Sequence, residues 1–407
     1  MKKESKERRA KSKEQNAFLS LLAVNHCLLF CLALCTTVLF SCNFSFGGKD
    51  GEEKSETWDT AQPLQEIYRS YFLLGNVVSP GDLGTMRFDL LRRHYNTATA
   101  ENAMKPDAIA PNVQPAGSDW AYRFSQADSV VNAVKTAGME MHGHTLVWHS
   151  QTPAWLTTGS KGTVVANLEK YAGEVVEHFK GKLVSWDVVN EAMRDGLTDT
   201  EANGNWEDCL RLNDLPGQAN SGSAWNRAIG PEYIERAFLA ARAADPDVIL
   251  YYNDFNLNNA YKAKAVYNMV RDINLRYPNV GGRPLIDGIG MQSHHHIFTD
   301  PRTVEDSINL FASLGVEIAI SEMEIMAAGT FGINPAVSWG DYAARLQAEQ
   351  YAAMFRIFKA NASKIKRVTF WGIDDKTSWR ASTYPTLLDE NYGLKPAFYA
   401  VANPERY

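Results

Sequence analysis

Short apolar runs alternate with amphipathic segments from about residue 62 to the end of the chain. Eight of these runs are rich in β-branched or aromatic residues and end in polar residues; they cover roughly 72–78, 97–102, 139–149, 183–191, 248–256, 288–294, 317–324 and 367–374. Runs of this length are typical of the buried strands of a parallel sheet. Each is therefore predicted to be a strand that carries polar side chains at its carboxyl end.

The segments between these runs have the spacing of helices. One of them is predicted to bury a single face and to end at the C-cap Gly138; its apolar positions are Phe124, Ala127, Val130, Val131 and Val134. Eight alternations of strand and helix predict an α/β fold with a single (β/α)₈ TIM barrel rather than two domains. An open doubly wound sheet is the alternative, but no Gly-rich phosphate loop follows the first run.

The first 42 residues differ from the rest of the chain. Residues 1–16 hold seven basic and three acidic side chains, and residues 17–41 hold no Asp, Glu, Lys or Arg. This pattern predicts an export segment. Its end resembles the bacterial lipobox, in which Cys42 is acylated and becomes the mature N-terminus, although Phe40 is an imperfect match. An uncleaved membrane anchor and simple secretion are the alternatives, and all three place the protein outside the cytoplasm.

Composition limits what the remainder can be. The chain has 407 residues, of which 45% are hydrophobic, and a net charge of −6, so a deep core is expected and nucleic acid is not expected as a partner. Four of the five Cys lie within residues 1–42, which leaves no intramolecular disulfide framework for the folded part. Residues 43–61 are rich in Gly, Lys and Glu and are interpreted as a flexible tether. Residues 62–407 form the predicted catalytic domain, expected to be monomeric.

Two of the predicted strands end in a glutamate. Glu191 follows Trp186, Asp187 and Asn190, and Glu322 lies near the end of the run 317–324. The functional groups of such barrels project from the carboxyl ends of the strands, so the two carboxyls are expected to face each other across the barrel mouth. Glycosidic cleavage needs such a pair, one protonated and one ionised. A structural role, capping a helix or pairing with an arginine, is the alternative for each glutamate taken singly.

The other strand ends carry amides, imidazoles and indoles. These groups lie within 101–106, 142–151, 292–296 and 371–380. Polar planar groups bond sugar hydroxyls, and aromatic faces cover the C–H faces of a sugar ring, so the combination favours a sugar site. The pattern His142-x-His144 also allows a metal-dependent hydrolase on the same barrel. A glycan-binding lipoprotein that has kept the cleft but not the reaction is the non-enzyme alternative.

Six motifs in this order resemble glycoside hydrolase family ten, the endo-β-1,4-xylanases. They cover 95–106, 143–155, 186–192, 252–256, 290–294 and 369–380, and the likeness extends from about Leu74 to Ala402. The resemblance implies a (β/α)₈ enzyme that cuts internal bonds of β-1,4-xylan and xylo-oligosaccharides with retention of configuration. It implies no metal or organic cofactor. It also implies a cis peptide bond between His144 and Thr145.

The resemblance assigns roles residue by residue. Glu191 would be the general acid/base, and Glu322 would be the nucleophile that forms a glycosyl-enzyme. Asn190 would contact the 2-hydroxyl of the sugar at the cleavage point, Gln292 would bond Glu191, and His294 would hold Glu322. The implied sugar-binding positions are Glu101, Asn102, Lys105, His144, Trp148 and Gln151 on the non-reducing side, Trp371 and Trp379 walling that half, and Tyr252 and Asn253 on the other half.

Two features depart from the family pattern. Glu324 occupies a position where the family usually has Asp, which orders the histidine beside the nucleophile. The extra methylene can reach the same imidazole or can misplace it, and activity is expected to survive. The stretch 193–223 is longer than the usual connection after the acid/base strand. It is interpreted either as a change to the reducing-side subsites or as an inert surface insertion.

Overall fold

A computed structural model describes residues 56–407, apart from 115–118, 216–220 and 333–334. Its strands are β1 Leu73–Val78, β2 Thr97–Ala100, β3 Glu140–Trp148, β4 Ser185–Asn190, β5 Ile249–Asp254, β6 Gly288–Met291, β7 His294–His296, β8 Glu317–Met326 and β9 Ile365–Phe370. Each of the eight predicted runs overlaps one of these strands; β8 extends two residues beyond its run, and β9 begins two residues before its run. The sixth run contains β6 and also includes His294, the first residue of β7. The two strands are separate because the chain turns at Ser293, where φ is +63°.

Eight of these strands form a closed parallel barrel. Pairing runs in the order β6, β5, β4, β3, β2, β1, β9, β8, and β6 pairs with β8 to close the ring. The short strand β7 pairs with the outer end of β8, where His294 lies opposite Glu324. This confirms the predicted (β/α)₈ barrel and rules out the open doubly wound sheet.

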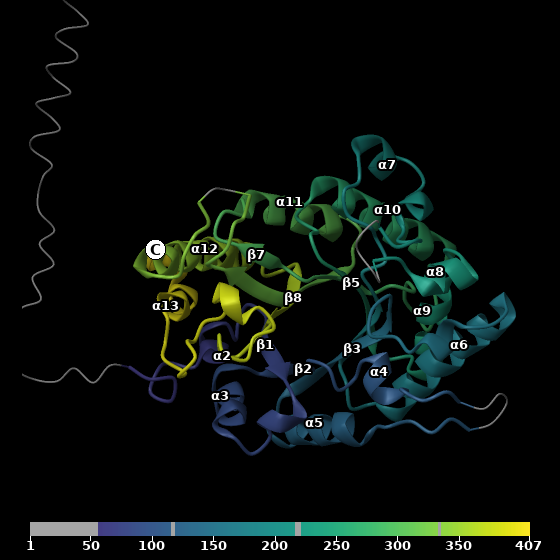
Figure 1. The fold of residues 1–407 in the computed structure, drawn as a ribbon, viewed down its shortest axis with the longest axis horizontal. Helices are drawn as coiled ribbons and strands as arrows, with labels where there is room; N and C mark the ends of the chain where they lie inside the picture. The colour runs from purple at the N-terminus through teal and green to yellow at the C-terminus, as the bar shows by residue number, and fades with distance from the viewer. Residues whose placement is uncertain (1–55, 115–118, 216–220, 333–334) are drawn as a thin grey trace, which may run out of the picture. The chain divides into compact units, whose positions relative to one another are not determined.

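Helices surround the strands (Figure 1). They are α2 Leu64–Ile67, α3 Met86–His94, α4 Pro106–Ile109, α5 Ser125–Thr136, α6 Lys161–His178, α7 Asp199–Asn203, α8 Ala224–Ile229, α9 Tyr233–Ala244, α10 Ala260–Arg276, α11 Pro301–Ala312, α12 Asp341–Ala360 and α13 Pro396–Ala402. The predicted apolar face of α5 is buried, and the chain leaves this helix through Gly138, whose φ is +76°. Such a left-handed residue after a helix favours glycine.

Close packing between neighbouring strands sets the positions of the strands that carry the polar groups. Trp186 of β4 is 1% exposed and lies against Gly143 of β3, where a Cβ atom would stand 2.2 Å from the indole ring. Only glycine fits there, because real Cβ contacts are far longer. The glycine therefore lets the Trp186 ring pack over β3 at the position where the two strands pair, just before their polar ends begin.

Residues 56–61 belong to the predicted tether, and in the structure they contact the barrel. Arg93 and His94 of α3 both bond the Trp58 carbonyl, at 3.1 and 2.7 Å, and Ala61 is 1% exposed. Residues 1–55, with the predicted export segment, lie outside the described residues, so the domain boundaries stay a prediction. Among the helices that are described, none is both long enough and apolar enough to span a bilayer.

Candidate functional site

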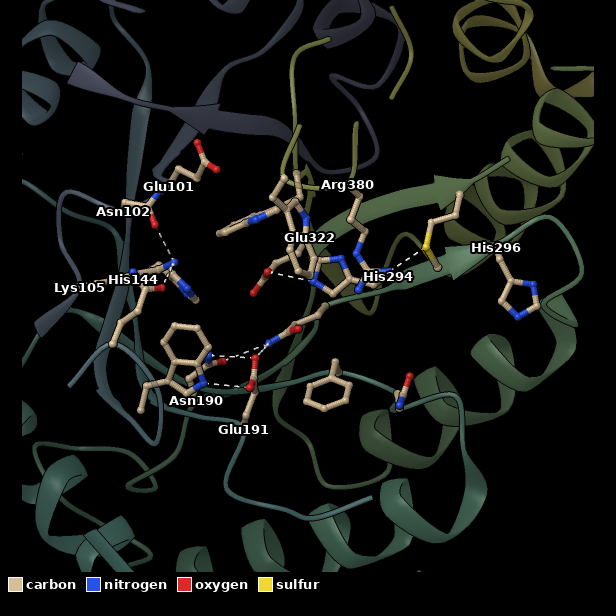
Figure 2. Close-up of a pocket in the computed structure, with 18 residues that line it drawn as sticks. Glu101, Asn102, Lys105, His144, Asn190, Glu191, His294, His296, Glu322 and Arg380 are labelled. Atoms are coloured by element: carbon tan, nitrogen blue, oxygen red, sulfur yellow. Dashed lines mark hydrogen bonds and ion pairs between the residues drawn. The ribbon is translucent and has the colours of Figure 1, made fainter. Parts of the chain in front are cut away.

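A cavity of about 650 Å³ opens at the carboxyl ends of the barrel strands (Figure 2). Most of the predicted site residues line it: Glu101, Asn102, Lys105, His144, Trp148, Gln151, Asn190, Glu191, Gln292, His294, Glu322, Trp371 and Trp379. Three other predicted residues, Tyr252, Asn253 and Glu324, lie beneath its surface, and each is at most 1% exposed. The barrel thus brings strand ends that are far apart in the sequence to one cavity.

Glu191 is the first residue after β4, and its backbone has a φ of +56°. Left-handed backbone at a residue other than glycine costs on the order of 1–3 kcal/mol and persists only where neighbours hold it. Trp148 Nε1 donates to Oε2 at 2.8 Å, and Gln292 Nε2 donates to Oε1 at 2.9 Å. The Glu191 N–H donates to the Asn253 carbonyl at 2.8 Å. The carboxylate is therefore held by side chains at the ends of β3 and β6, and the Glu191 backbone is held by β5.

Glu322 enters the cavity from β8 and is 5% exposed. Asn253 Nδ2 donates to its Oε1 at 2.9 Å, and His294 Nε2 lies 3.2 Å from its Oε2. Burial acts to raise the pKa of Glu322, but the hydrogen bond from His294 and the electrostatic effect of His144 and His294 outweigh it, so the pKa lies below its usual value. Glu322 is therefore ionised at neutral pH.

One amide links the two carboxyls. Asn190 Oδ1 accepts from Gln292 Nε2 at 3.2 Å and from Asn253 Nδ2 at 3.0 Å, and these same nitrogens donate to Glu191 and Glu322. The opposite orientation of the Asn190 amide would turn its own NH₂ group toward both of these NH₂ groups, so the oxygen belongs on this side. The two carboxyls are thus tied to one shared amide network.

His294 lies between Glu322 and Glu324, two residues apart on β8. Glu324 Oε1 is 2.7 Å from His294 Nδ1, so the longer side chain does reach the imidazole, which was one of the two outcomes open for this departure. Arg380 Nε lies 3.0 Å from the same Glu324 oxygen. Burial acts to lower the pKa of His294, but the Glu324 charge and the hydrogen bonds to both carboxylates raise it to about 9. The ring is therefore an imidazolium at neutral pH and donates to both carboxylates.

This raised pKa predicts how the stability of the domain depends on pH. A histidine with a folded pKa of about 9 and an ordinary value of 6.5 contributes ~3 kcal/mol of stability, fully present below about pH 6.5 and lost as the pH rises through 9. Urea unfolding gives the free energy of unfolding at pH 7 and at pH 10. The fall between these two pH values should be smaller in His294→Gln than in the wild type, by about this amount. Equal falls in both proteins would contradict the assigned charge.

A lysine is buried among the polar groups at the other end of the cavity. Lys105 Nζ donates to Asn102 Oδ1 at 3.0 Å and to Gln151 Oε1 at 2.9 Å, and it lies 5.1 Å from the centre of the Trp148 ring. Burial lowers the pKa of Lys105, although the surrounding carboxylates oppose this. Glu101 accepts a hydrogen bond from Ser79 and also lines the cavity. This end therefore presents several fixed donors and acceptors beside an indole face.

A buried carboxylate orients the next cavity residue. His144 Nδ1 lies 2.8 Å from Asp187 Oδ2, and its ring meets the edge of Trp371 at 5.2 Å. Burial acts to raise the pKa of Asp187, but His142 and His144 outweigh it and keep this carboxyl ionised. The peptide bond between His144 and Thr145 is cis, as the resemblance implied. Across the described ranges, no three His, Cys, Asp or Glu side chains are grouped so that they could hold a metal ion.

The β5 end differs from the expectation. Tyr252 and Asn253 were expected on the cavity wall, but both are fully buried: Tyr252 bonds Asp254, and Asn253 bonds the amide network. The cavity is lined instead by Phe255 and Asn256, which follow the end of the strand. The motif 252–256 located this region, but only the point at which the strand ends decides which of its side chains reach the surface.

Three further residues line the cavity that sequence reasoning did not nominate: His296, Met326 and Arg380. Figure 2 places His296 at the end of the site away from Glu101, with Arg380 beside His294. Arg380 is the last residue of the motif 369–380 and directly follows the predicted Trp379, so membership of that motif was the available signal. His296 lies in the segment 292–296, in which only Gln292 and His294 are predicted to have a role. Its ring stacks on Phe331 at 4.9 Å, a contact between the end of β7 and a later turn that no spacing reveals.

Comparison with known proteins identifies several relatives. The family model described as Glycosyl hydrolase family 10 matches residues 63–404. Endo-1,4-beta-xylanase A of Thermotoga maritima is 36% identical over 358 residues, which is 84% of this chain and 31% of that protein, so the chain spans about a third of its length. The beta-1,4-xylanase of Dictyoglomus thermophilum is 35% identical over 83% of this chain and 90% of that protein. A solved GH10 xylanase with a bacterial Ig-like domain, from termite gut, has a TM-score of 0.77 and 35% identity over 86% of this chain and 79% of that one.

Proposed function

The chain belongs to glycosyl hydrolase family 10, and on that premise we propose that it is an endo-β-1,4-xylanase that hydrolyses internal bonds of xylan with retention of configuration. The observation that carries the proposal is the pair Glu191 and Glu322, which enter one cavity from β4 and β8 and are tied to one amide network. Retention requires two such carboxyls on either side of a single anomeric centre.

In the first step, the ionised Glu322 attacks the anomeric carbon while Glu191 gives its proton to the departing glycosidic oxygen. The bond from carbon to that oxygen breaks as the bond to Glu322 forms, which leaves a glycosyl-enzyme. In the second step, Glu191 accepts a proton from water, and the water oxygen displaces Glu322 from the sugar. The lowered pKa of Glu322 supports its assignment, because only the ionised carboxylate is a nucleophile.

Four neighbours serve these steps in the proposed mechanism. Asn190 contacts the 2-hydroxyl of the sugar, and Gln292 bonds Glu191 while that group changes between acid and base. His294 donates to Glu322, and Glu324 keeps the imidazole charged and oriented. The contacts at 2.7–3.3 Å that join these six side chains support this division, because each supporting group bonds a carboxyl directly or through one intermediate.

The two halves of the cavity are proposed to bind different parts of the xylan chain. On the non-reducing side the sugar-binding residues are Glu101, Asn102, Lys105, His144, Trp148 and Gln151, with Trp371 and Trp379 as the wall. On the other half Phe255 and Asn256 replace the buried Tyr252 and Asn253 as the surface that meets the leaving chain. Trp379 is 56% exposed, which is typical of an aromatic face that a polymer covers on binding.

The proposed function is tested by following hydrolysis of xylan, of xylotetraose and of cello-oligosaccharides with proton NMR. We expect cleavage of internal bonds of the polymer, which creates new reducing ends, and the β-anomer as the first product. Initial appearance of the α-anomer would refute retention. Binding of xylan without new reducing ends would instead identify a glycan-binding protein, and cleavage confined to cello-oligosaccharides would refute the substrate.

The location of the protein is a separate proposal that rests on the sequence of residues 1–42. We propose export and acylation at Cys42, because a basic start and an uncharged apolar run precede this cysteine. A lipid chain would hold the enzyme at a membrane surface, next to the polymer it degrades. Expression with labelled palmitate should label the wild-type chain and not Cys42→Ser. Equal labelling of both would refute acylation at this cysteine.

A further inference from the structure

The first part of the long stretch 193–223, residues 193–211, folds back onto Glu191. It contains α7 and the 3₁₀ turn Trp206–Cys209. Met193 and Leu210 then form an antiparallel bridge, flanked by hydrogen bonds from Arg194 N–H to the Cys209 carbonyl and from Arg211 N–H to the Ala192 carbonyl, at 3.0 and 2.9 Å. This short ladder returns Arg211 to the residues that directly follow the end of β4.

The Arg211 side chain is 7% exposed and points back at Glu191. Its Nε donates to the Glu191 carbonyl oxygen at 2.9 Å. The rest of the guanidinium is held from other sides: it donates to the Ser221 carbonyl at 3.2 Å, lies 3.4 Å from Asp195 Oδ2 and sits 5.4 Å from the centre of the Phe255 ring. These four partners leave the Arg211 guanidinium, which donates to the Glu191 carbonyl, little freedom to move.

That carbonyl belongs to a residue whose backbone conformation needs support. Glu191 has a positive φ, and its own N–H is held by the Asn253 carbonyl. Its C=O is held by Arg211. If the chain rotated about the Glu191 N–Cα bond toward a negative φ, the carbonyl carbon and Cβ would turn together, so the carbonyl would leave Arg211 and the side chain would swing away from Gln292 and Trp148.

We propose that Arg211 is a positioning residue for the acid/base Glu191: by holding the Glu191 carbonyl, it keeps the carboxyl aimed at the glycosidic oxygen. This rests on the proposed function of Glu191. It also gives part of the long stretch 193–223 a task, since this stretch is what carries the guanidinium back to the site. Arg211 touches no reacting atom, so its effect passes entirely through the geometry of Glu191.

A misplaced acid matters only where the leaving group needs a proton. Cleavage of xylotetraose expels a sugar hydroxyl, which requires protonation, whereas cleavage of a 2,4-dinitrophenyl β-xylobioside expels a stable phenolate, which does not. In Arg211→Gln, kcat/KM should fall about 10- to 100-fold for xylotetraose and less than about threefold for the dinitrophenyl substrate. A merely structural loss would lower both values by the same factor.

The matched control is Arg227→Gln. Arg227 also donates to a backbone carbonyl of this region, that of Leu212 at 2.8 Å, but it does not contact Glu191. Its ratio of the two kcat/KM values should stay within about twofold of wild type. Melting temperatures of all variants show whether each is folded, and Arg211→Lys, which keeps the charge but not the guanidinium fork, repeats the comparison if Arg211→Gln does not fold.

Three outcomes decide between the ideas. A larger loss on xylotetraose than on the dinitrophenyl substrate supports the proposal. Equal losses, or no loss, in a folded Arg211 variant overturn it. If the wild-type chain itself does not cleave xylotetraose, the proposed substrate fails, and the same comparison is then made with the aryl and oligosaccharide forms of the sugar that it does cleave.

Discussion

Replacing Glu322 with alanine is expected to reduce kcat on xylan by at least about 10⁴-fold, the scale on which loss of the nucleophile acts in other covalent enzymes. Without this carboxylate no glycosyl-enzyme can form. The positive charge that develops at the anomeric carbon also loses the negative group that faces it. Because the cavity is open, water can solvate His294 and Asn253 once their partner is removed, so the fold is expected to survive.

A strong azide effect would identify the step that is lost. With an activated aryl xylobioside, azide should enter the space that Glu322 vacates and give the α-glycosyl azide, because a single displacement inverts the anomeric centre. Glu317→Gln is the matched control: Glu317 lies on the same strand β8, but at its other end, where it bonds the Tyr251 hydroxyl. Its activity should stay within about twofold of wild type. Substantial turnover by a well-folded Glu322→Ala would refute the assignment.

The architecture could be predicted because its signals are local. A buried parallel strand needs a continuous apolar run, and eight such runs with helical segments between them allow few folds. The carboxyl ends of parallel strands must meet at one end of a barrel. This topology alone predicts that Glu191 and Glu322 reach one cavity. The apolar face of α5 and its glycine stop likewise followed from spacing alone.

The rest depends on contacts between segments that are distant in the sequence. The point at which β5 leaves the barrel decides whether Tyr252 or Phe255 meets solvent. The order of polar and aromatic residues along 252–256 does not specify this point. The break at Ser293 that separates β7 from β6 is hidden in the same way. Arg211 lies twenty positions after Glu191 in a stretch with no motif, and only the bridge of Met193 with Leu210 brings it back.

The protonation states of buried side chains are equally hard to predict from the sequence. A histidine between two strand-end glutamates could be neutral or charged, and sequence alone does not say which. In the structure, the Glu324 carboxylate, reaching the ring from the same strand as Glu322, makes the imidazolium the stable form. The substitution of Glu for the family's Asp is therefore compatible with the arrangement that the proposed nucleophile needs.

Glu191→Ala is expected to separate substrates by leaving group. Hydrolysis of xylan should fall by about 10²- to 10⁴-fold, the usual contribution of general acid catalysis, because the departing sugar oxygen receives no proton. An activated aryl xylobioside should still form the glycosyl-enzyme at close to the wild-type rate. The glycosyl-enzyme should then accumulate after a burst of released phenolate, since no base activates the water of the second step.

Azide distinguishes this variant from Glu322→Ala by stereochemistry. Here the anion needs no base, enters where Glu191 stood and attacks an intermediate that is already inverted once, so the product should be the β-glycosyl azide. One added reagent thus gives opposite anomers from the two variants if Glu322 is the nucleophile and Glu191 the acid/base. The same anomer from both, or equal losses of Glu191→Ala on xylan and aryl substrates, would mean that the two carboxyls do not divide the reaction in this way.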